Sequence, residues 1–190
     1  MNIFVLDENP RAAAQMHCDR HVCKMSIEYA QILSTVHHVC GSHIAKTEDI
    51  YKPTHAKHPS TLWAMSHPLH YAWLYELMCE TWNEYTYRYQ RTHASSRLLT
   101  ALRVVPDMAT SNIVPTAPPQ CMPNSCRVSG ASWQSTIDAY RAYYRQEKAG
   151  FATWKNRQVP DWFLPHNSID VIRSTVYNDT HETQSTSLGR

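Results

Sequence analysis

The chain has 190 residues, 43% of them hydrophobic, with four glycines against eleven prolines. This length is typical of a single domain, and so few glycines argue against an all-β fold with many tight turns. The formal net charge of +2 neither demands nor excludes a nucleic-acid partner. No apolar run approaches the roughly 18 residues that a membrane-spanning helix needs, so we expect no membrane association.

Cysteine and histidine bear on the environment of the protein. The six cysteines are scattered without a CxxC pair, and the first residues lack the basic lead and apolar core of a signal peptide. We therefore expect free thiols in a reducing compartment, the cytoplasm. Ten of the twelve histidines fall between His17 and His93, so mild acid is expected to make this half of the chain positive.

In chain order, the first expected elements are a strand and a long helix. Residues 2–6 are apolar and β-prone, which predicts one short strand. Asn9 can then cap a helix whose first position suits Pro10, and Gly41 ends it near residue 40. Further helices are expected from Pro59, from Pro68 to about Arg91, over 94–104 and over 132–156.

Two stretches are expected to lack regular structure. Residues 105–130 contain five prolines, and a loop of this length inside a compact domain is usually functional or disordered. The polar, Ser- and Thr-rich end is typical of a flexible tail. We thus predict a mostly α, bundle-like single domain over 1–173, with one short N-terminal strand and a long Pro-rich loop, followed by a flexible polar tail over 174–190.

Polar residues on the first long helix are spaced by four, three, four, three and four positions, which places them in one row beside an apolar face. The row consists of His17, His21, Lys24, Glu28, Gln31 and Thr35. Such a row suits the edge of a pocket, where burial would make Lys24 a nucleophile or Glu28 a general base. A solvated face with a Lys–Glu pair worth about 0.2–0.5 kcal/mol would show the same spacing.

His17 and His21 also have the spacing of two helical metal ligands, and Glu28, His55 or His58 could complete a site. The zincin pattern is absent, because no glutamate follows the first histidine. We therefore assign no metal ligand, and a divalent metal at His17 and His21 stays an alternative.

Other segments carry possible substrate contacts. His58 precedes an expected helix start, where anions bind, although a capping role explains it equally. The interleaved aromatic and basic residues after Tyr140 suit base stacking and phosphate contact, or a core helix with arginines at its edge. The residues of this segment that we assign to substrate are Arg141, Arg145 and Trp154. The Pro118–Pro123 run is either a rigid pocket wall or a plain connector.

Several segments, which together cover most of residues 1–163, resemble a family of small, mostly uncharacterised proteins of tailed phages. They are residues 1–7, the run from His17 to Thr35, His58-Pro59-Ser60 with Trp63, Pro118–Pro123, and the stretch from Tyr140 to Phe163. This resemblance implies no particular activity.

A more distant similarity is to pyrimidine-dimer DNA glycosylases, small helical enzymes with a short apolar N-terminus. In these enzymes a histidine or other polar residue precedes a catalytic glutamate by seven residues, as His21 precedes Glu28 here. The resemblance implies that the amine at the start of the chain is the nucleophile and that the glutamate assists opening of the sugar. Because the second residue is Asn2, removal of Met1 is not expected, so Lys24 is a substitute source of the amine.

We therefore expect a phage-type enzyme acting on the N-glycosidic bond of a nucleotide or nucleic acid. Its catalytic residues would be Glu28 as acid and base, Lys24 as nucleophile or phosphate anchor, and His21. Its substrate-binding residues would be His17, Gln31, His58, Arg141, Arg145 and Trp154. A non-catalytic nucleotide-binding protein that sequesters a host defence signal, a metal-dependent hydrolase, and a homo-oligomeric state remain open.

Overall fold

The computed structural model describes residues 1–108 and 114–164. The chain divides into two compact units, Met1–Arg157 and Gln158–Arg190. The boundary therefore lies inside the domain that we predicted over 1–173, and the predicted tail over 174–190 lies outside the described residues. In the second unit the described part contains one 3₁₀ turn, η5 (Asp161–Phe163).

The first unit is built from helices, which confirms the predicted mostly α class. Its α-helices are α1 (Pro10–Met16), α2 (Asp19–Val39), α3 (Ile44–Thr47), α4 (Pro59–Ser66), α5 (Pro68–Tyr89), α6 (Leu99–Leu102) and α7 (Trp133–Tyr143). Shorter 3₁₀ turns are η1 (Ala94–Leu98), η2 (Asn124–Cys126) and η4 (Ala149–Phe151), and η3 (Tyr144–Lys148) is a π-helical turn. No helix in these described ranges has the length and apolar character to cross a bilayer.

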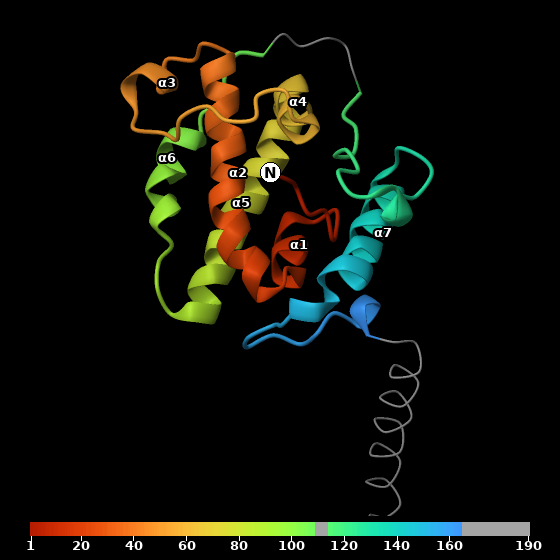
Figure 1. The fold of residues 1–190 in the computed structure, drawn as a ribbon. Coiled ribbons are helices and arrows are strands. Elements are labelled where there is room, and N and C mark those ends of the chain that lie inside the picture. Colours follow the sequence, from red (N-terminus) through yellow and green to blue (C-terminus); the bar gives the residue numbers. More distant parts are fainter. Residues whose placement is uncertain (109–113, 165–190) are drawn as a thin grey trace, which may run out of the picture. The chain divides into compact units, whose positions relative to one another are not determined.

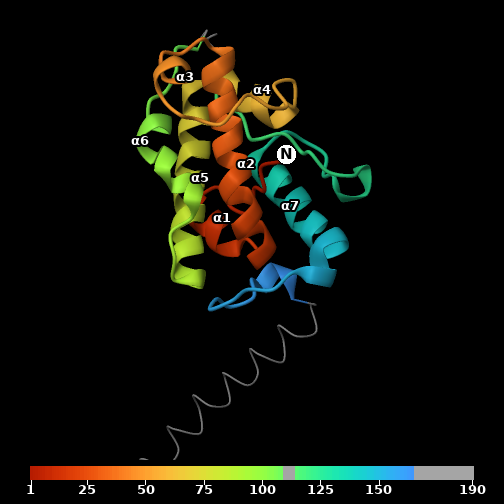
Figure 2. The ribbon, with the colours of Figure 1, turned by 60° about the vertical axis from the view of Figure 1, so that its left-hand side comes forward.

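The long helices α2 and α5 lie side by side, and α1 packs on α5 (Figure 1). The first residues of the chain run between α2 and α7, as Figure 2 shows from a second direction. Fully buried side chains from these segments form the core, including Ile3, Leu6, Met25, Tyr29, Leu33, Leu74, Leu77, Tyr140 and Tyr144. The beginning of the chain is thus part of the core.

The predicted N-terminal strand is wrong, because the described residues contain no strand. Residues 3–6 are buried, but side chains rather than a neighbouring strand bind the backbone of this segment. The amide of Phe4 donates to the Tyr29 hydroxyl at 3.3 Å, and Arg141 donates to the carbonyl of Leu6 at 2.8 and 3.1 Å. The apolar pattern therefore indicates that the segment is buried, and it does not distinguish a buried strand from a buried irregular segment.

The single helix predicted over about 10–40 is two helices. His17 and Cys18 adopt extended backbone angles between α1 and α2. Distant groups stabilise the break: the amide of Asp19 donates to the carbonyl of Thr153 at 2.8 Å, and the indole of Trp154 donates to the carbonyl of Met16 at 2.9 Å. The break separates His17 from the helix that carries Glu28.

The last predicted helix, over 132–156, also ends early. The α-helical part stops at Tyr143 and continues as the π-helical turn η3 and the 3₁₀ turn η4. Likewise, the helix predicted over 94–104 is η1 followed by α6. In the predicted loop over 105–130, the described residues form one short 3₁₀ turn, η2.

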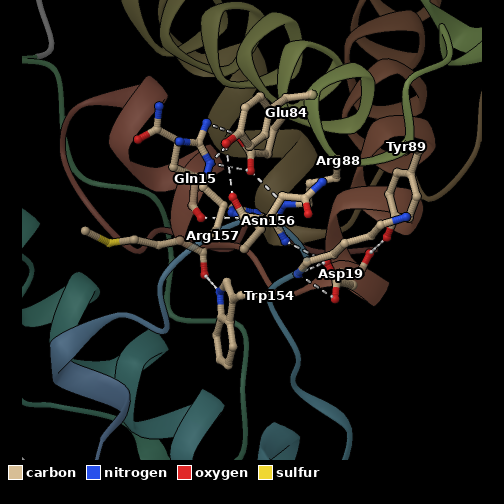
Figure 3. A network of polar contacts seen from close by, with 12 residues as sticks. Gln15, Asp19, Glu84, Arg88, Tyr89, Trp154, Asn156 and Arg157 are labelled. Carbon is tan, nitrogen blue, oxygen red and sulfur yellow. Dashed lines mark hydrogen bonds and ion pairs between the residues drawn. The ribbon is translucent and has the colours of Figure 1, made fainter.

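A buried ionic network joins α1, α2 and α5 to the segment after η4 (Figure 3). Arg88 donates to Glu84 at 2.6 Å, to Asp19 at 2.9 Å and to the carbonyl of Gln15 at 3.0 Å. Arg157 binds both carboxylate oxygens of Glu84 and lies 4.1 Å from the centre of the Tyr87 ring. The side chains of Arg88 and Glu84 are buried, so their charges rely on each other rather than on water.

Candidate functional site

Glu28 on α2 holds three nitrogen atoms with one carboxylate. Its Oε1 lies 3.3 Å from Nζ of Lys24, one helical turn earlier. Its Oε2 accepts the backbone N–H of Asn2 at 3.1 Å and lies 3.8 Å from the backbone nitrogen of Met1. The side chain of Glu28 is 14% exposed, so protein covers most of the carboxylate.

The start of the chain is fixed in place beside this carboxylate. The Met1 side chain is buried, and its sulfur accepts the hydroxyl of Thr61 from α4 at 3.8 Å. The side-chain nitrogen of Asn2 donates to the backbone carbonyl of Cys121 at 2.9 Å, and its side-chain oxygen accepts the hydroxyl of Tyr140 from α7 at 2.7 Å. Helix α4, helix α7 and the Pro-rich segment therefore all contact the first two residues.

A pocket of about 520 Å³ lies next to the start of the chain. It is lined by His58, Pro59, Pro119, Gln120, Cys121, Met122, Pro123, Arg127 and Tyr143. It is an open depression rather than an enclosed cavity, and its volume falls within the roughly 300–1,000 Å³ typical of small-molecule sites. Residues 119–123 form its wall, which is one of the two alternatives that the sequence left open for the Pro118–Pro123 run.

His58 lines the pocket and lies within electrostatic range of Glu28. Burial, the charge of the terminal amine and His55 lower the pKa of His58, while Glu28 opposes this shift. The Nδ1 of His58 accepts the amide of Ser60 at 3.2 Å and so caps α4. His58 therefore both caps α4 and lines the pocket, so its role as a cap is compatible with the predicted role in binding substrate.

Lys24 does not have the burial that would make it a nucleophile. Its side chain is 67% exposed, and its ammonium group lies on the outer side of Glu28. Gln31 is half-buried one turn further along α2, whereas Thr35 is buried. The predicted single row of six polar side chains is therefore wrong beyond the Lys24–Glu28 pair, because His17 lies in the break before α2 and because His17, His21 and Thr35 are buried.

His17 lies in the core, where it cannot bind substrate without a rearrangement. Its Nδ1 donates to the carbonyl of Ala13 at 2.6 Å, and its Nε2 accepts the hydroxyl of Tyr29 at 2.7 Å. That hydroxyl in turn accepts the amide of Phe4 at 3.3 Å. The predicted substrate role of His17 is corrected to a structural one: it orients Tyr29, which holds the N-terminal segment.

His21 is also buried, in a group of aromatic rings. It stacks on Phe4 with ring centres 4.1 Å apart, and its Nδ1 is hydrogen-bonded to the hydroxyl of Tyr144 at 2.5 Å. Burial, reinforced by the charges of His17, Lys148 and Lys24, lowers its pKa to about 3. His21 therefore supports Phe4 beneath the start of the chain as a neutral ring, whereas we expected it among the catalytic residues.

These buried histidines predict acid sensitivity. Burial lowers the pKa of His17 to about 4, so between pH 6.5 and 4 the unfolded chain binds a proton that the native protein excludes. Stability is complete above pH 6.5 and is lost as the pH falls, by roughly 1.4 kcal/mol per pH unit for each such histidine. Urea unfolding from pH 7 to 5 measures the loss. A His17 imidazole NMR signal that titrates near pH 6.5 would contradict this account.

The three residues assigned to substrate after Tyr140 are placed differently. Arg141 donates to the carbonyl of Leu6 and lies 3.8 Å from the carboxylate of Asp7. Trp154 is buried and donates to the carbonyl of Met16. Arg145 is exposed on η3. Arg141 and Trp154 therefore hold the N-terminal segments, as we expected if this stretch belongs to the core rather than to a substrate site.

Sequence reasoning missed several residues of the site. Asn2, Tyr140, Arg127 and Tyr143 were not assigned, although they contact the start of the chain or line the pocket. Asn2 was considered only for its effect on removal of Met1. No spacing rule links these positions to Glu28, since they come from separate segments that meet only in the folded protein.

Among residues 1–108 and 114–164, no group of three or more His, Cys, Asp or Glu side chains is arranged to hold a metal ion. Comparisons with known protein families, with curated proteins and with solved structures found no match.

Proposed function

We propose that the protein is an enzyme acting on an N-glycosidic bond of nucleic acid or of a nucleotide, with the amine at the start of the chain as nucleophile and Glu28 as acid and base. The observation that supports this proposal is that the backbone nitrogens of Met1 and Asn2 both lie near the same oxygen of Glu28, Oε2. The resemblance to pyrimidine-dimer glycosylases implies the same pair of groups. Lys24 is then an anchor for a phosphate, since it is exposed.

The geometry serves this chemistry for either form of the chain start. With Met1 retained, the amine lies 3.8 Å from Oε2 of Glu28. With Met1 removed, the nitrogen of Asn2 becomes the amine, and it lies 3.1 Å from the same oxygen. The proposal requires a free amine at one of these two positions, which an intact mass of the purified protein tests directly.

The reaction proceeds in two steps. The lone pair of the amine attacks C1′ of the sugar, and the base leaves with the electron pair of the N-glycosidic bond and takes up a proton. The C1′–O bond of the sugar ring then breaks as a C1′=N imine forms; the nitrogen has lost both protons, and the ring oxygen gains one from Glu28. Water later hydrolyses the imine, which restores the amine and releases the sugar aldehyde.

Borohydride trapping tests the proposal. The reagent reduces the imine to a stable secondary amine, so incubation with duplex DNA that contains an abasic site should give a covalent protein–DNA adduct. Peptide mapping should place the adduct on residue 1 or 2. The matched control carries a short peptide ahead of Met1, which moves the amine away from Glu28 and should abolish the adduct. An adduct on Lys24 would transfer the nucleophile there, and no adduct would overturn the proposal.

The pocket favours a second candidate, a nucleotide-binding protein without chemistry. Arg127 and Tyr143 line it, and the Nζ of Lys148 lies 4.3 Å from the centre of the Tyr143 ring, so two cations near the pocket could contact a phosphate. Mass spectrometry of the native and then the denatured protein distinguishes the two functions. Release of an intact nucleotide, with no adduct on abasic DNA, would favour the binding protein over the enzyme.

A further inference from the structure

A single buried hydroxyl connects the start of the chain to the pocket wall. Tyr140 on α7 is fully buried. Its hydroxyl lies 2.7 Å from Oδ1 of Asn2 and 3.0 Å from the carbonyl oxygen of Pro119, and it accepts the amide of Cys121 at 3.3 Å. A phenol has one proton to donate, so the Asn2 and Pro119 oxygens share it.

Asn2 is consequently held from two sides. Its side-chain oxygen accepts the Tyr140 hydroxyl, and its side-chain nitrogen donates to the carbonyl of Cys121. Its backbone nitrogen points at Glu28. With the amide side chain fixed at both ends, the backbone of residues 1 and 2 has little freedom to leave the carboxylate.

We propose that Tyr140 is a positioning residue: it holds the reactive amine at the Oε2 atom of Glu28 and fixes the position of the pocket wall relative to that amine. This inference rests on the proposed function, because it assigns the amine a reaction. Tyr140 acts through Asn2 on one side and through Pro119 and Cys121 on the other. A displacement of about 1 Å in a reacting group can cost on the order of 10²-fold in rate. Loss of the Tyr140 hydrogen bonds should therefore lower the turnover rate rather than the affinity for substrate.

The test compares two tyrosine-to-phenylalanine variants. Tyr140→Phe removes the hydroxyl and keeps the ring. The matched control is Tyr71→Phe, since Tyr71 is equally buried and its hydroxyl donates to the carbonyl of Leu102 at 2.8 Å, in a contact between α5 and α6. Each variant loses one buried phenol, but only the first loses a partner of Asn2.

The first readout is the rate of borohydride trapping at several concentrations of abasic DNA. In Tyr140→Phe the rate at saturation should fall at least about tenfold, with the half-saturating concentration changed by less than about twofold. Tyr71→Phe should keep the wild-type rate at a similar loss of stability. Equal rates in the two variants would overturn the positioning role.

The second readout is independent of catalysis. The Asn2 amide is hydrogen-bonded to Glu28, so its hydrogen exchange, followed by NMR, should speed up at least about tenfold in Tyr140→Phe and not in Tyr71→Phe. Unchanged exchange in Tyr140→Phe, or faster exchange with an unchanged trapping rate, would overturn the inference alone. A wild-type protein that forms no adduct would instead overturn the proposed function, and the inference with it.

Discussion

Replacing Glu28 by glutamine should abolish turnover and leave the fold intact. The variant keeps the shape of the side chain but can neither take a proton from the amine nor return one to the sugar oxygen. A positioned acid or base typically contributes about 10²–10⁴-fold to a rate, so trapping on abasic DNA should slow by that amount. The partly exposed pair with Lys24 contributes little to stability, and the free energy of unfolding should change by about 1 kcal/mol or less.

The control for this variant is Glu80→Gln. Glu80 lies on α5, has a partly exposed carboxylate as Glu28 has, and pairs with Arg11 at 3.7 Å. The Glu80→Gln variant therefore loses a comparable charge outside the group of residues around Glu28, and it should keep full activity. Full activity in Glu28→Gln as well would remove Glu28 from the reaction.

Replacing Arg88 by methionine should produce the largest loss of stability. Arg88 is fully buried and compensates the charge of Glu84, which is 3% exposed, and of Asp19. Removing Arg88 leaves Asp19 without this ion pair and leaves Glu84 to Arg157 alone. Loss of one partner of a buried ion pair costs roughly 3–5 kcal/mol. For a protein of this size the melting temperature should fall by on the order of 10 °C, and urea unfolding measures the free energy directly.

Two further variants show whether burial is the cause. Arg11→Met removes an exposed arginine from the pair with Glu80 and should cost less than about 1 kcal/mol. Adding Glu84→Gln to Arg88→Met removes the buried negative charge that Arg157 then compensates alone, and should recover part of the loss. If Arg88→Met costs no more than Arg11→Met, water reaches the network and the charges are not buried.

Local signals predicted the helix starts well. Pro10, Pro59 and Pro68 each begin a helix, because proline has the backbone angle of the first position and lacks the donor that would be left unpaired there. The residues before them, Asn9, His58 and His67, each accept a backbone amide with the side chain. These interactions span a few residues, so the sequence alone contains them.

Long-range contacts decide what the sequence did not predict. No glycine or proline marks the break at His17, because it depends on hydrogen bonds from α1 and α2 to residues near Thr153. The Lys24–Glu28 pair followed from helical spacing, but the approach of Asn2 to Glu28 spans 26 residues. Only the resemblance to glycosylases suggested an amine beside this glutamate. Burial of His17 and His21 was likewise invisible, since their spacing also fits an exposed stripe.

The ionic network around Arg88 has a consequence for synthesis on the ribosome. Asp19 accepts the hydroxyl of Thr153 and the amide of Lys155, and Glu84 binds Arg157. The first 108 residues therefore emerge with a buried cluster that lacks its last partners until residue 157 has left the exit tunnel. We expect the helices α1, α2 and α5 to associate during that interval while the network stays open to water on the side that residues 153–157 cover in the finished protein.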